Sequence, residues 1–229
     1  LAASIPSFGN LRVFAEDNVT FSDTFDDETS LANWTTVQLN TAVAKQKDLT
    51  ISPDGRLVPA VYAGKHAAVS YLSAAAIEGM KPTKFETEFT LQADTIADNN
   101  SYIVLYYDRT NVNGNMIALD ISEGTVSGGN DLETVVHIAA VGPGITLSKT
   151  TNGGNILRDN GNTNPDETVD ITKPIKIITT YNYDKWASDR ILGVGVQAEY
   201  TNKAGAEKNT YVYNFEFTFK SNYTPIEDF

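Results

Sequence analysis

Apolar and polar residues alternate one by one along several stretches of the chain, and long helical periodicity is missing. In FETEFTLQ (85–92), phenylalanine, threonine and leucine take turns with glutamate, threonine and glutamine. The stretch YVYNFEFTFK (211–220) places an aromatic residue at every second position. Side chains of a β-strand point alternately to the two faces of a sheet, so this pattern predicts strands with one buried face.

Other stretches complete the set of predicted strands. SYIVLYYDR (101–109) is apolar on both faces, as expected for a central strand, and ISPDGRLV (51–58) is typical of a hairpin in which Gly55 takes a positive φ. Only SYLSAAAIEGM (70–80) predicts a helix, and a short one. Further predicted strands are NMIALDIS (115–122), TVVHIAAV (134–141), PIKIITTYNY (174–183) and ILGVGVQAEY (191–200).

Short connections rich in Gly, Asn and Asp separate these stretches, which favours antiparallel pairing. We therefore predict an all-β fold, an antiparallel β-sandwich of jelly-roll type with one short helix at most. No repeat and no linker divides the chain, so we expect a single domain over 21–229. Residues 1–20 have little periodicity and are expected to form an N-terminal arm outside the sandwich or an extra strand.

Charge and composition exclude several function classes. The 229 residues carry a net charge of −12 without a Lys/Arg stripe, which argues against nucleic acid and anionic membranes as partners. No apolar run approaches the ~20 residues that membrane insertion needs. Cysteine is absent, which excludes disulfides, thiol nucleophiles and cysteine-ligated zinc. The chain opens at Leu1 without a basic or apolar leader, as expected of a processed chain or an excised domain.

The stretch FSDTFDDETSLANW (21–34) concentrates acidic residues between aromatic ones. Calcium takes six to eight oxygen ligands from carboxylates and backbone carbonyls, and Asp23, Asp26 and Asp27 could supply carboxylates within one turn. The alternative is a solvated turn without a metal, and the residues alone leave both open. Phe21 and Trp34 are expected to anchor the turn in the core.

The order of these pieces resembles the concanavalin A-like lectin/glucanase superfamily, in its laminin-G-like and bacterial carbohydrate-module branch. FSDTFDDETSLANWTTV resembles the family's opening turn and first strand, and PDGRLVP its early hairpin. SYIVLYYDRTNVNGNMIALDIS resembles the central hairpin, and NFEFTFKSNYTPIEDF the closing strand. The resemblance implies the jelly-roll sandwich. It also implies that the chain end returns beside the opening turn, where Asp228 would join a structural calcium.

Catalytic chemistry finds little support in the sequence. Glycoside hydrolysis needs two carboxyl groups on opposite sides of the bond. Glu86 and Glu88 share one strand face, and the third acid of the look-alike glucanases is missing, so the pair is interpreted as a polar strand face. His66 and His137 are the only histidines, and no serine nucleophile motif is present. We expect no catalytic residues.

Sugar binding needs an aromatic ring that stacks on the apolar face of a pyranose, and polar groups that form hydrogen bonds with its hydroxyls. Two stretches offer both. YNYDKW supplies Tyr183, Asp184 and Trp186, although Trp186 could instead plug the edge of the sandwich. YYDRTN supplies four more candidates: Tyr107, Asp108, Arg109 and Asn111.

These features favour a non-catalytic, lectin-like carbohydrate-binding module with a glycan or polysaccharide as its partner. A secreted or bacterial cell-surface location fits that function. The alternative is a structural or adhesive surface protein, such as a virion decoration protein, an appendage subunit or an adhesin domain, which would bind other protein subunits. A glycoside hydrolase is the least favoured class.

Overall fold

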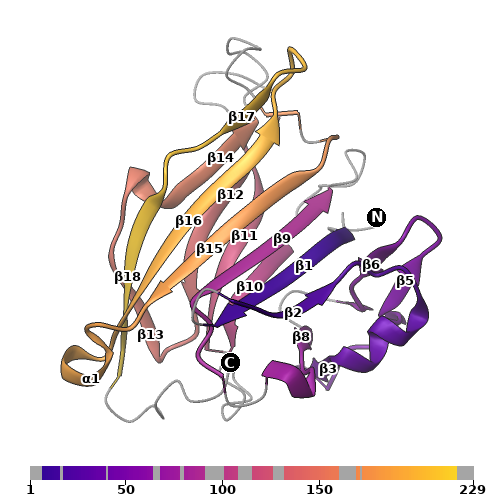
Figure 1. The fold of residues 1–229 in the computed structure, drawn as a ribbon, viewed down its shortest axis with the longest axis horizontal. Helices are drawn as coiled ribbons and strands as arrows, with labels where there is room; N and C mark the ends of the chain where they lie inside the picture. Colours follow the sequence, from indigo (N-terminus) through magenta and orange to yellow (C-terminus); the bar gives the residue numbers. More distant parts are fainter. Residues whose placement is uncertain are drawn as a thin grey trace.

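The computed structural model describes residues 7–15, 18–39, 41–63, 68–77, 80–90, 101–107, 115–125, 132–159, 169–170 and 172–220. Within these ranges the fold is all-β, and each strand pairing is antiparallel. Two sheets lie face to face as a β-sandwich (Figure 1). The predicted fold class is thus confirmed, while the jelly-roll connection of the strands stays a prediction.

The larger sheet has ten strands. Eight follow one another in the spatial order β13 (Ile145–Lys149), β18 (Tyr213–Phe219), β16 (Ile191–Thr201), β15 (Ile175–Asn182), β9 (Lys84–Thr90), β1 (Ser7–Ala15), β6 (Arg56–Val58) and β5 (Thr50–Ser52). The other two are β17 (Glu207–Asn209), paired with β16, and β2 (Asn18–Asp23), paired with β1.

The smaller sheet has the order β10 (Ser101–Tyr107), β11 (Met116–Thr125), β12 (Leu132–Val141) and β14 (Asn155–Asp159). Two further pairs are β3 (Trp34–Gln38) with β8 (Ala68–Leu72), and β4 (Lys45–Lys47) with β7 (Val61–Tyr62). The helical segments are one α-helical turn, α1 (Trp186–Asp189), and three 3-10 segments, η1 (Glu28–Asn33), η2 (Ala75–Ile77) and η3 (Asn152–Gly154). No helix in the described ranges is long and apolar enough to cross a membrane.

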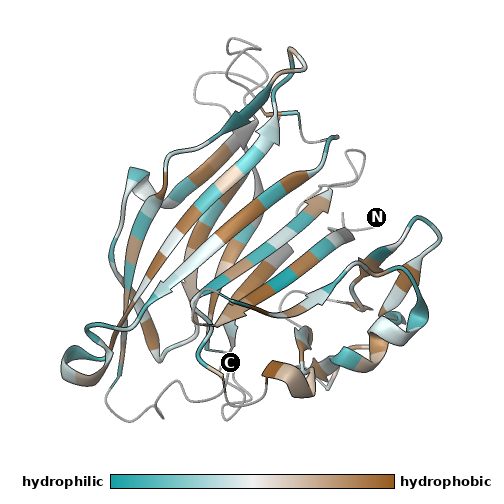
Figure 2. Ribbon diagram, viewed as in Figure 1, coloured by the Kyte–Doolittle hydropathy of each residue, from teal (hydrophilic) through white to brown (hydrophobic). Residues whose placement is uncertain are grey.

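The main hydrophobic core fills the space between the two sheets. Alternate residues of β18 point into it, and Phe215, Phe217 and Phe219 are at most 3% exposed. Ile117 and Leu119 of β11 meet them from the smaller sheet and are fully buried. Figure 2 shows the corresponding alternation of hydrophobic and hydrophilic bands along the strands of the large sheet. Burial of each such side chain contributes about 1.5 to 3 kcal/mol, which makes this alternation the main determinant of the fold.

Strand β1 lies inside the large sheet, between β9 and β6. Its residues Leu11 and Val13 are buried in a second core that also contains Phe25. Residues 7–15 are therefore a strand of the large sheet. Among the residues of β1 whose burial is described, two buried residues alternate with polar neighbours, a pattern too short to identify a strand.

The predicted helix in residues 70–80 is present only as the 3-10 turn η2, because its first part belongs to β8. Strand β8 pairs with β3, and this two-stranded sheet packs Val69 and Tyr71 against Met116 and Ala118 of β11. Tertiary packing on the outer face of the smaller sheet thus overrides the local preference for helix. The one α-helical turn, α1, lies elsewhere in the chain and was not expected.

Candidate functional site

The acidic turn after β2 holds its aspartates in different surroundings. Asp23 is 9% exposed, and its Oδ1 atom accepts hydrogen bonds from the Phe25 amide at 2.9 Å and the Ser30 hydroxyl at 2.7 Å. Its Oδ2 atom is buried with no hydrogen-bond partner. Asp26 and Asp27, in contrast, are exposed. The structure therefore directs one carboxylate of the turn inward and leaves two in solvent.

The two exposed aspartates have local structural roles. Asp27 is the N-cap of η1, and hydrogen bonds from the Thr29 hydroxyl and amide lower the pKa of its carboxyl group. Asp26 accepts a hydrogen bond from the Thr24 hydroxyl. Asp228, the fourth predicted ligand, lies outside the described residues. Among the residues that the structure describes, no three His, Cys, Asp or Glu side chains stand close enough to hold a metal.

Trp186, the predicted sugar-stacking residue, is 6% exposed. Its indole ring packs edge-on against Phe219, with ring centroids 4.9 Å apart, and Arg190 covers it with a guanidinium carbon 5.3 Å from the ring centroid. A ring enclosed in this way has no free face for a sugar. Of the two alternatives, the structure shows the plug at the edge of the sandwich.

The neighbours of Trp186 are also engaged in the fold. The Tyr183 hydroxyl donates to the Pro82 carbonyl at 2.9 Å, and the Asp184 amide donates to the Asn182 side chain at 2.8 Å. Burial raises the pKa of the Tyr183 hydroxyl, which therefore stays protonated as a donor. These hydrogen bonds fix the segment at the end of β15, where Asp184 itself stays exposed.

The other predicted sugar-binding stretch lies at the same end of the sandwich. Tyr106 in β10 packs against Phe219 with ring centroids 5.3 Å apart, and Phe219 in turn contacts Trp186. The two candidate stretches thus approach each other through a buried aromatic cluster. Tyr107 is the last residue of β10, while Asp108, Arg109 and Asn111 lie outside the described residues.

Glu86, one of the two acids considered for catalysis, lies among lysine side chains. The Glu86 carboxylate lies beside Lys84 and within 3.9 Å of Lys176, on the outer face of the large sheet. A separate Asp–His pair, which the sequence did not indicate, joins Asp120 and His137 with their Oδ2 and Nε2 atoms 3.5 Å apart.

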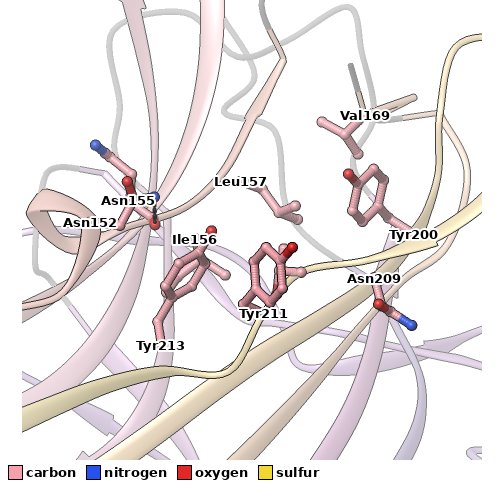
Figure 3. Close-up of a pocket in the computed structure, with 10 residues that line it drawn as sticks. Asn152, Asn155, Ile156, Leu157, Val169, Tyr200, Asn209, Tyr211 and Tyr213 are labelled. Atoms are coloured by element: carbon pink, nitrogen blue, oxygen red, sulfur yellow. Dashed lines mark hydrogen bonds between the residues drawn. The ribbon is translucent and has the colours of Figure 1, made fainter. Parts of the chain in front are cut away.

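A groove of about 490 Å³ lies where the two sheets part. Strand β14 and the turn before it form one wall, and the ends of β16, β17 and β18 form the other (Figure 3). The lining residues are Asn152, Asn155, Ile156, Leu157, Val169, Tyr200, Asn209, Thr210, Tyr211 and Tyr213. Volumes of this size are typical of small-molecule and sugar sites.

A β-bulge between β17 and β18 shapes the aromatic wall. Residues 197–198 of β16 stand opposite residues 210–212, one more than a regular ladder allows. The Thr210 side chain replaces a missing backbone partner at the bulge, because its hydroxyl accepts a hydrogen bond from the Ala198 amide at 2.9 Å in place of a backbone carbonyl. Gln197 adds a side-chain bond to the Thr210 carbonyl at 3.2 Å. Bulges redirect neighbouring side chains, and here the redirected residue is Tyr211, which is 87% exposed.

The turn Asn152–Gly154 builds the opposite wall. All three residues have positive φ values of 51°, 60° and 86°, which Asn tolerates and Gly adopts freely. The Asn152 side chain donates to the Asn155 carbonyl at 2.9 Å, and the Thr151 hydroxyl ties the turn to β18 through the Asn214 carbonyl at 2.6 Å. Two amide side chains are thereby held at the mouth of the groove.

The composition of the groove matches the chemistry of sugar recognition. Figure 3 shows the rings of Tyr213, Tyr211 and Tyr200 following one another along it, with Asn152 and Asn155 at one end and Asn209 at the other. Tyrosine rings can cover the apolar face of a pyranose, and amides donate to and accept from its hydroxyls. No protein-family model, curated protein or solved structure matches this chain.

Proposed function

We propose that the protein is a non-catalytic carbohydrate-binding module and that the tyrosine groove is its glycan site. The observation that carries this proposal is the row of three tyrosine rings beside three asparagine side chains in one open groove. Tyr211 matters most, because an aromatic ring that is 87% exposed contributes almost nothing to the core. Together with the rings of Tyr200 and Tyr213 in the same groove, it offers an aromatic surface on which a sugar could stack.

The resemblance of the chain to the concanavalin A-like superfamily supports the same proposal, since that fold hosts many lectins and carbohydrate modules. A secreted or cell-surface location would bring the module to polysaccharides. The placement of Glu86 among lysines supports a polar strand face rather than an acid–base pair. Binding without hydrolysis is therefore the favoured activity.

A structural calcium at the acidic turn belongs to the same proposal. A buried carboxylate oxygen without a partner is costly, and the Oδ2 atom of Asp23 is in that position. A calcium ion bound there would satisfy it, with backbone carbonyls of the turn and acids from the chain end as further ligands. The ion would stabilise the turn and take no part in sugar binding.

A glycan array tests the proposed function. The wild-type protein should bind a subset of glycans, and Tyr211→Ala should lose them. Val212→Ala is the matched control, because Val212 is 51% exposed but does not line the groove. Absence of wild-type binding to any glycan, or equal binding by Tyr211→Ala, would contradict the proposal.

A further inference from the structure

We infer that the groove selects neutral oligosaccharide chains, and that neither charge nor a bound metal contributes to recognition there. This inference rests on the proposed function. Each of the ten described lining residues is uncharged: the set consists of asparagine, threonine, tyrosine and three aliphatic side chains. The groove therefore recognises its ligand through stacking and neutral hydrogen bonds.

An acidic glycan would find no cationic partner for its carboxylates or sulfates in this described lining. Such groups bind tightly where Arg or Lys meets them, and a charge that is desolvated without a counter-charge costs free energy. The whole chain carries a net charge of −12, which repels polyanions at long range. Neutral sugars avoid both penalties.

The lining also argues against sugar binding through a calcium bridge. Calcium requires several oxygen ligands, and proteins supply most of them from carboxylates. The described lining contains amides and hydroxyls but no carboxylate. The acidic turn after β2 lies at the far side of the sheet from β17 (Figure 1), so an ion there cannot touch a sugar in the groove. Chelation should leave glycan affinity unchanged.

The arrangement of the rings favours a chain over a single sugar. Tyr211 and Tyr213 are two residues apart along an extended segment, which separates them by about 7 Å. Tyr200 comes from a different strand, β16, and continues the row. One pyranose can cover one of these rings, so successive units of a chain are needed to cover all three.

Affinity gel electrophoresis tests each part of this inference. The intact protein is run through gels that contain a neutral polysaccharide (mixed-linkage β-glucan, arabinoxylan, galactomannan or starch) or an acidic one (alginate, polygalacturonate or heparin). The runs are repeated at about 0.1 M and about 1 M NaCl, between which the Debye length falls from about 10 to about 3 Å. They are repeated with EDTA, and with mono- and oligosaccharides of the retarding polymer as soluble competitors.

We expect retardation by at least one neutral polysaccharide, unchanged by salt or EDTA. Tyr211→Ala should weaken it about tenfold or more, and Val212→Ala should not. Oligosaccharides should compete better than the monosaccharide. Retardation by acidic polymers alone, tenfold weakening in high salt, or loss with EDTA would overturn this inference while leaving carbohydrate binding intact. Absence of retardation in every gel would instead overturn the proposed function itself.

Discussion

At β18 and the segment before it, phenylalanine residues lie in the core and tyrosine residues line the groove. Along the inward face of β18, Phe215, Phe217 and Phe219 are buried and Tyr213 is half-buried, whereas Tyr211, which precedes the strand, is exposed. On β16 the inward residues are aliphatic as far as Ala198 and end in Tyr200. A phenol can face water at its polar end and an apolar ligand at its ring. The change from Phe to Tyr therefore marks where the sandwich interior opens to solvent.

Truncation of these rings should separate binding from stability. Tyr211→Ala should change the free energy of unfolding by less than about 0.5 kcal/mol, because an exposed side chain has little packing to lose. Phe215→Ala, on the same face but 1% exposed, should cost about 3 to 5 kcal/mol. Urea titration followed by circular dichroism measures both values. A loss above about 2 kcal/mol for Tyr211→Ala would show that this ring is structural.

At the scale of elements, the bulge between β17 and β18 contributes both to the pairing of the large sheet and to the shape of the groove. The Thr210 hydroxyl is the acceptor for the Ala198 amide, and Ala198 is fully buried. The same side chain therefore completes the sheet and sets the position from which the following tyrosine projects. A hydrogen bond in the sheet and the proposed ligand contact of Tyr211 therefore both depend on Thr210.

Replacement of Thr210 tests this dependence. Thr210→Val keeps the shape but leaves the buried Ala198 amide unsatisfied, at a cost of about 1 to 3 kcal/mol. The displaced Tyr211 should also weaken glycan binding. Thr210→Ser retains the hydroxyl and should restore most of both properties. If Val and Ser variants have equal stability by urea titration and equal retardation in a polysaccharide gel, the hydroxyl has no such role.

A second element-scale link connects the two sheets. The Tyr181 hydroxyl in β15 donates to the Leu105 carbonyl in β10 at 2.8 Å, inside the core. Burial raises the pKa of Tyr181, so the folded state keeps a proton that the unfolded chain loses above about pH 10. The stabilisation is complete below that pH and decreases as the pH rises through and beyond it.

Tyr181→Phe should lower the free energy of unfolding at neutral pH by about 1 to 3 kcal/mol, because the Leu105 carbonyl loses its donor. It should also make the decline of stability above about pH 10 less steep than in the wild type. Urea titrations at a series of pH values measure both effects. Parallel pH curves for the two proteins would exclude a buried, protonated Tyr181.

The elements differ in how well the sequence predicts them. Strands with long alternation, such as β9 and β18, were predicted correctly because each position contributes to the same buried face. Strand β1 was not, because Leu11 and Val13 are its only deeply buried residues among those whose burial is described. The bulge beside Tyr211 escaped prediction, since it depends on the register between β16 and the next strand.

At the scale of the whole molecule, burial depends on residues that are distant in the sequence. Trp186 looks like a loop tryptophan in its own segment, but it packs against Phe219 and belongs to the main hydrophobic core. The groove likewise combines residues 152–157 with residues 200–213, which no local pattern connects. The sequence identifies residues whose side chains could bind a sugar. Whether those side chains are exposed depends on the three-dimensional fold and could not be predicted.

At the scale of the whole molecule, we also predict that removal of calcium lowers the melting temperature. If Asp23 binds calcium, the ion at about 100 times its dissociation constant adds ~2.7 kcal/mol, a rise of about 5 to 10 °C in melting temperature over EDTA. Asp23→Asn should abolish the difference, and substitution of the exposed Asp48 should not. A melting temperature insensitive to EDTA, with Asp23→Asn more stable than wild type, would show that the turn holds no ion.

The central claim, that the tyrosine groove binds a neutral glycan chain, is tested most directly by NMR chemical-shift mapping. The ¹⁵N-labelled protein is titrated with oligosaccharides from neutral polysaccharides, and the amide shifts are followed in two-dimensional spectra. We predict saturable shifts concentrated in residues 152–157 and 209–213. Shifts confined to the end of the sandwich around Trp186, or to the outer face of the large sheet, would contradict the claim, as would the absence of shifts with every sugar.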